Sequence, residues 1–137
     1  MVIDSGTITV NAVDDGIRGK DYLVVNGGTI TVGACGDGLK SDNEEDATKG
    51  YVSIAGGTLA VTAAGDGIDA VTDVVVTNGD LTVASGGGST TTPAADASSA
   101  KGIKGTASVV IEGGQFSLDP EELASIIDVV ATIASTG

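Results

Sequence analysis

The chain has 137 residues, of which 22 are glycine and only three are aromatic, and its formal net charge is −13. The length predicts a single domain, and the negative charge argues against binding to nucleic-acid phosphates or to anionic membranes. With 41% hydrophobic residues the chain is too apolar to be disordered, so its core must consist of small β-branched side chains. The single cysteine, Cys35, excludes an internal disulfide, and we expect it to be a small buried filler.

A segment with a glycine-containing turn and alternating apolar residues recurs along the chain. Its five copies are residues 3–10, 25–32, 54–61, 76–83 and 111–118. The anchoring glycines are spaced by 22, 29, 22 and 35 residues, which defines a 22-residue unit with insertions of 7 and 13 residues. A second block, first seen as Asp15-Gly16-Ile17, keeps the same register. Its other copies begin at Asp37, Asp66 and, in divergent form, Lys101.

Each unit contains three short strand patterns. In the first, Ile8 and Val10 alternate with Thr7 and Thr9, which is the period of a half-buried strand. The Gly-Ile pair marks the second strand, and runs such as residues 74–76 mark the third. Because a strand–helix repeat needs more than 22 residues, we predict a right-handed parallel β-helix (β-solenoid) of about four to five coils.

The predicted β-helix spans residues 1–118, with insertions at 41–49 and 86–100, and residues 119–137 form a C-terminal cap or assembly segment. A helix-start signal begins at Asp119, and apolar residues then recur at helical spacing, which predicts a capping helix over about 120–133. The alternative is a strand, since residues 126–130 are rich in β-branched side chains. Such a strand could be donated to another subunit.

Stacked coils place equivalent acidic residues above one another. Asp15, Asp37 and Asp66 would form a column with steps of about 5 Å, which is unfavourable unless a cation lies among them. Asp14 adds a carboxylate at the first layer and Asp69 at the third, so these five residues are candidate ligands for calcium. The alternative is that Asp-Gly is only favourable turn chemistry.

A second column contains most of the basic residues. Arg18, Lys40 and Lys104 share one repeat position with Asp69, and we predict that these three cations bind carboxylates of an acidic sugar. The alternative is that they only neutralise the acidic column. Because the chain has no histidine, the common catalytic triads are absent, and we expect the protein not to be an enzyme.

The repeated segment 27–32, the Asp-Gly-Ile turns and residues 99–104 resemble a bacterial family of secreted carbohydrate-binding proteins. The resemblance implies a pectate-lyase-like right-handed parallel β-helix with bound calcium. It also implies binding of cell-wall polysaccharides, including polygalacturonate and cellulose, and an extracellular location. The calcium positions that it implies are Asp14, Asp15, Asp37 and Asp66.

Our leading hypothesis is therefore non-catalytic, calcium-dependent binding of acidic, pectin-like polysaccharide. The main alternative is an extracellular structural subunit that stacks end to end into filaments, because a parallel ladder exposes backbone groups at its ends. A β-eliminase using Arg18 or a lysine as base is a further alternative. Another is ice binding by the outward threonines, of which Thr7, Thr9, Thr29 and Thr31 form two complete pairs.

Overall fold

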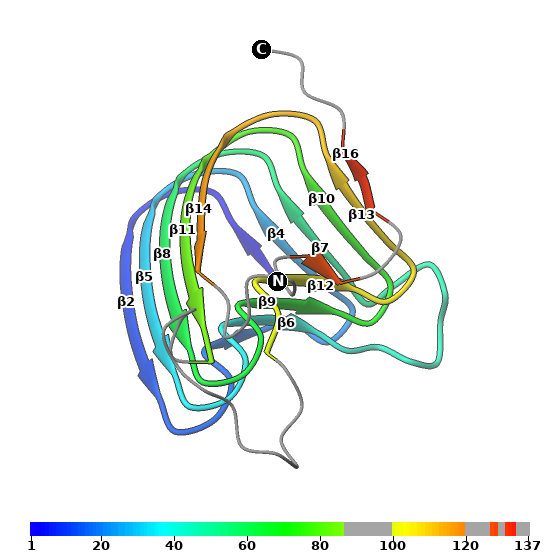
Figure 1. Ribbon diagram of the computed structural model, residues 1–137, viewed down its shortest axis with the longest axis horizontal. Helices are drawn as coiled ribbons and strands as arrows, with labels where there is room; N and C mark the ends of the chain where they lie inside the picture. Colours follow the sequence, from blue (N-terminus) through cyan, green and yellow to red (C-terminus); the bar gives the residue numbers. More distant parts are fainter. Residues whose placement is uncertain (87–99, 120–126, 129–130, 134–137) are drawn as a thin grey trace.

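The computed structural model describes residues 1–86, 100–119, 127–128 and 131–133. These residues form strands, turns and loops, and the strands belong to three parallel sheets around a shared interior (Figure 1). The chain visits the three sheets in turn, which is the architecture of a parallel β-solenoid. The all-β solenoid predicted from the repeat is thus confirmed. Its right-handed winding, the division at residue 118 and end-to-end stacking stay predictions.

Each sheet takes one strand from each coil. The first sheet contains, in spatial order, β1 (Val2–Ile3), β4 (Tyr22–Val25), β7 (Tyr51–Ile54), β10 (Asp73–Val76), β13 (Ser108–Ile111) and β16 (Ala131–Ile133). The second contains β2 (Thr7–Ala12), β5 (Thr29–Ala34), β8 (Thr58–Ala63), β11 (Asp80–Ser85) and β14 (Gln115–Asp119). The third contains β3 (Ile17–Arg18), β6 (Leu39–Ser41), β9 (Ile68–Ala70), β12 (Ile103–Gly105) and β15 (Ile127–Asp128).

The pairing register reproduces the sequence repeat. Ile8 pairs with Ile30, at the 22-residue spacing of the unit. Leu39 pairs with Ile68 across the 29-residue spacing, because all of the insertion 41–49 except Ser41 lies between β6 and β7. The register therefore places the repeat positions above one another, as the candidate site requires.

Inward-facing aliphatic side chains form the core in columns, one residue from each coil. Ile30, Leu59 and Leu81 make up one such column and are at most 1% exposed. Ile8 begins this column at the edge strand β2 and is only partly buried. Stacked aliphatic layers thus fill the interior almost without aromatic rings, as the composition predicted.

Two sets of glycines allow the coils to stack. The glycine before each strand of the second sheet adopts a positive φ, as at Gly28 with φ 102°, which side chains rarely tolerate. Gly38, after an aspartate, is needed for another reason. A Cβ atom there would collide with the Val61 side chain and lie 2.6 Å from the Gly67 carbonyl oxygen. Asp-Gly in this chain is therefore a close-packing motif.

The helix predicted over residues 120–133 is wrong where the structure describes that segment. Ile127 and Asp128 form β15, which pairs with β12, and residues 131–133 form β16, which pairs with β13. The β-branched residues thus continue the parallel ladders in place of a helix. Residues 120–126, 129–130 and 134–137 lie outside the described residues. Within the part of the chain that the structure describes, no helix is long and apolar enough to cross a membrane.

Candidate metal centre

The predicted aspartate column forms at the turns that precede the strands of the third sheet. The Oδ1 atom of Asp15 accepts the backbone N–H of Asp37 at 3.0 Å, and Asp37 Oδ1 accepts the N–H of Asp66 at 2.8 Å. Asp66 Oδ1 accepts the N–H of Lys101 at 2.7 Å, so each aspartate caps the next coil. The Oδ1 atom of each carboxylate therefore binds the backbone of the next coil, and the Oδ2 atom is left to interact with cations.

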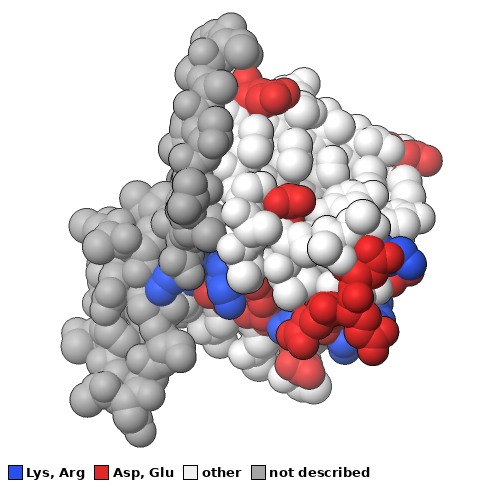
Figure 2. Space-filling view, turned by 90° about the vertical axis from the view of Figure 1, so that its right-hand side faces the viewer, with Lys and Arg blue, Asp and Glu red and all other residues white. Residues whose placement is uncertain are grey.

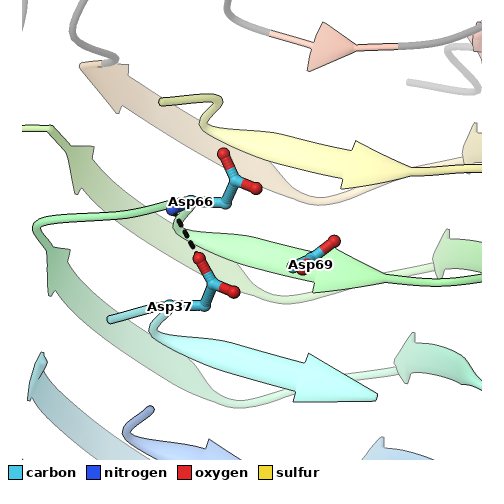
Figure 3. Close-up of side chains that lie close together, drawn as sticks. All are labelled: Asp37, Asp66 and Asp69. Carbon is cyan, nitrogen blue, oxygen red and sulfur yellow. Dashed lines mark hydrogen bonds between the residues drawn. The ribbon is translucent and has the colours of Figure 1, made fainter. Parts of the chain in front are cut away.

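Three carboxylates of neighbouring coils converge beside this column. One oxygen each of Asp37, Asp66 and Asp69 lies within 4.8 Å of the other two, and all three side chains are partly buried. Asp37 and Asp66 come from successive turns, whereas Asp69 projects from β9 next to them (Figure 3). Oxygen ligands at this spacing could hold a metal ion.

The other two predicted ligands lie outside this cluster. Asp15 is one coil away, with Oδ1 on the Asp37 N–H and Oδ2 at 3.8 Å from the Lys40 ammonium. Asp14 is exposed, and its backbone carbonyl accepts the N–H of Gly36. Hence the structure brings together three of the five predicted ligands, Asp37, Asp66 and Asp69, and leaves Asp14 at the surface.

Two lysines reach into the same cluster. The Lys40 Nζ atom is 2.9 Å from Asp37 Oδ2 and 3.7 Å from Asp69 Oδ2. The Lys104 Nζ atom is 3.8 Å from Asp66 Oδ2 and 3.7 Å from Asp69 Oδ1. With Asp15 included, four carboxylates face two ammonium groups, which leaves a formal charge of −2. One divalent cation would neutralise that remainder.

Burial and the excess negative charge raise the pKa values of two of the clustered aspartates. The pKa of Asp69 is raised to about 6, first by burial and then by the charges of Asp37 and Asp66, against the opposing attraction of Lys104. Burial likewise raises the pKa of Asp66, and the nearby Asp37 charge adds to this. The site therefore favours taking up positive charge, from a proton or from a metal ion.

The predicted sugar-binding cations do not all lie together. Arg18 is bound in two places by Asp42, with Nη2–Oδ2 at 2.6 Å and Nε–Oδ1 at 3.2 Å, and so ties β3 to the insertion 41–49. Lys40 and Lys104, in contrast, line one hollow of about 240 Å³. The other lining residues are Ser41, Asp42, Glu44, Asp69, Val71 and Thr106.

The hollow is also lined by residues that the sequence repeat did not predict. Asp42 and Glu44 come from the acidic insertion, and Thr106 follows β12. The signal in the sequence was the acidic composition of the insertion 41–49, which contains Asp42, Glu44, Glu45 and Asp46. Figure 2 shows Asp and Glu side chains gathered with a few Lys and Arg in the lower part of one face, below a broad area with few charges.

Cys35 is exposed, so its assignment as a buried filler is wrong. It shares its repeat position with Val13 and Ala64, which are exposed as well. The reason is that this position follows the end of a strand in the second sheet, where the chain turns and side chains point outward. Cys35 and its neighbours line an apolar surface groove of about 560 Å³, and Cys35 lies two residues before Asp37 of the aspartate column.

Fold and site together define a parallel β-solenoid with an acidic seam that could hold a metal ion. The seam consists of the side chains of Asp15, Asp37, Asp66, Asp69, Lys40 and Lys104. A family model described as carbohydrate-binding domain-containing protein matches residues 1–133, and the chain belongs to this family. The searches of curated proteins and of solved structures gave no match. The carbohydrate-binding class expected from the sequence is therefore confirmed.

Proposed function

We propose that this protein is a non-catalytic, extracellular module that binds acidic polysaccharide through a calcium ion at Asp37, Asp66 and Asp69. The observation that carries the proposal is the cluster of four carboxylates and two lysines, with a formal charge of −2, beside the hollow. Calcium suits an all-oxygen donor set, and it can take further oxygens from water and from a sugar carboxylate. Membership of a carbohydrate-binding family supports the polysaccharide as partner.

An acidic sugar fits this seam better than a neutral one. A uronate carboxylate could complete the coordination of the cation and accept charge-assisted hydrogen bonds from Lys40 and Lys104, which line the same hollow. Arg18 remains a predicted contact, although its guanidinium already has a carboxylate partner in Asp42. Charge on both the cation and the lysines makes the binding sensitive to salt.

Lys40 and Arg18 are poor candidates for the base of an eliminase. Burial opposes a charged Lys40, yet the hydrogen bond to Asp37 and the charges of Asp15 and Asp69 outweigh it and raise the lysine pKa. A lysine held in its protonated form cannot readily accept a proton. Arg18, paired with Asp42, also has its pKa raised, first by that hydrogen bond. These features support binding without catalysis.

Retention on covalently cross-linked polygalacturonate tests the proposal. We expect calcium-dependent retention that falls on adding salt or a chelator, and much weaker retention on a neutral glucan. Lys104→Met should reduce retention at least about tenfold, since one charge-assisted contact to a carboxylate contributes about 1.5–3 kcal/mol. The matched control is Lys49→Met, because Lys49 pairs with Asp21 outside the cluster. Equal retention on both polymers, unchanged by the chelator, would refute the proposal.

A further inference from the structure

Lys40 lies where a cation bound by the cluster would compete with it. Its ammonium is within 3.8 Å of carboxylate oxygens on three coils: Asp15, Asp37 and Asp69. Two of these residues, Asp37 and Asp69, also belong to the group of three that could hold a metal ion. The same oxygens cannot hold both the ammonium and a desolvated divalent cation at full strength, because like charges at this separation repel strongly.

The side chain of Lys40 can move into the neighbouring hollow. Lys40 lines the hollow together with Lys104 and Asp69, and its side chain keeps 24% of its exposure. Four methylene groups give the ammonium the reach to leave the column by rotation of its side chain alone. The backbone of β6 can stay fixed, since Leu39 is fully buried and pairs with Ile17 and Ile68.

We infer that Lys40 is a built-in counter-ion, which calcium displaces from Asp37 and Asp69 into the hollow, where its ammonium then serves the carboxylate of the polysaccharide. The inference rests on the proposed function and adds a coupling between the binding of calcium and the binding of the acidic glycan. Without calcium, Lys40 satisfies the column and is withheld from ligand. With calcium bound, the ammonium is released beside the cation. Calcium and the acidic glycan therefore strengthen each other's binding, and by linkage the factor is the same in both directions.

Lys104 does not play the same part. Its ammonium is no closer than 3.7 Å to any of the carboxylates it pairs with here, whereas Lys40 makes a hydrogen bond of 2.9 Å to Asp37. Lys104 is also the more exposed of the two, at 36% against 24%. Lys40 is thus the main competitor for the metal, and removing it should tighten calcium binding.

Calorimetric titration with calcium alone tests the inference on the full chain. We expect Lys40→Met to bind calcium at least about tenfold more tightly than the original protein, because one positive charge near the ion is removed. Lys49→Met, the same substitution in an ion pair outside the cluster, should bind as the original protein does. In the original protein, saturating oligogalacturonate should raise calcium affinity, and it should do so less in Lys40→Met.

NMR of the original protein provides a second test, which does not depend on whether Lys40→Met folds stably. The NMR signals of the Lys40 Cε methylene should move toward those of an unpaired lysine as calcium is added, while those of Lys49 stay in place. Equal or weaker calcium binding by Lys40→Met, or Lys40 signals that ignore bound calcium, would overturn the inference and leave the calcium site standing. Absence of calcium binding in every variant would overturn the proposed metal site and the inference with it.

Discussion

Replacing Gly38 by alanine is expected to destabilise the fold by about 3 kcal/mol, at the upper end of the usual cost of overpacking. A Cβ atom at this position would collide with Val61 and lie 2.6 Å from the Gly67 carbonyl oxygen, both in the next coil. The neighbours cannot move apart cheaply, since the Leu39 N–H donates to that same oxygen at 2.9 Å. Urea denaturation followed by far-UV circular dichroism measures the change in the free energy of unfolding.

Gly33→Ala is the matched control for this substitution. A Cβ atom at Gly33 would lie 3.1 Å from Asn11 Oδ1, the tip of a side chain on an exposed residue that can turn away. We expect an effect within about 0.5 kcal/mol, typical of surface positions. If both substitutions cost the same, the glycines of the Asp-Gly blocks are not required for coil stacking.

Calcium is expected to raise the melting temperature by several degrees near neutral pH and by much less in mild acid. Binding to the folded state alone contributes about 2.7 kcal/mol when free calcium is a hundredfold above Kd. Asp69, with its pKa raised to about 6 first by burial, is protonated in acid and is then a poor ligand. Melting curves in millimolar calcium and in chelator, recorded at several pH values, measure the difference.

In the metal-free protein, Asp69 should make the opposite contribution, so that stability falls as the pH rises. The pKa of Asp69 is about 6 in the folded state and 3.8 without its surroundings, so the folded state binds the proton more tightly. Its contribution to stability is therefore present at low pH and is lost as the pH rises through about 6. Asp69→Asn should remove both this pH dependence and most of the calcium effect. A calcium effect that is equal at all pH values would contradict the role of Asp69.

The sequence predicted the solenoid because its repeat carries the register. An aliphatic residue follows each Asp-Gly or Lys-Gly pair, and Ile17, Leu39, Ile68 and Ile103 do stack in the third sheet. Small differences of spacing also mattered, since the 29-residue step located the insertion 41–49 before β7. A period of two within a fixed unit leaves few alternatives for which face of each strand is buried.

The same information failed where the repeat ends. Residues 127–128 and 131–133 satisfied a helical period and a strand composition alike, and pairing with β12 and β13 gave the strand. A short apolar run cannot settle that choice by itself. Cys35 failed for a related reason, because its repeat position had been assigned to the interior while the turn of the chain exposes it.

The candidate site was predicted in part. Register alone placed Asp37 over Asp66 and put Asp69 in the column with Lys40 and Lys104. It could not show which carboxylates the long lysine side chains reach, since that depends on rotatable bonds and on the local charge. The pairing of Arg18 with Asp42 depended in addition on the path of an insertion without a repeat partner.

The most direct test is the binding of oligogalacturonate to the full chain by calorimetry, in millimolar calcium and in chelator. We expect micromolar-to-millimolar binding in calcium, at least about tenfold weaker binding in chelator, and the same loss in calcium for Asp37→Asn combined with Asp69→Asn. Asparagine at residue 37 keeps an oxygen that can accept the Asp66 N–H, so the scaffold bond is preserved. Binding of equal strength in all three cases would contradict a cation-dependent acidic-polysaccharide site at this seam.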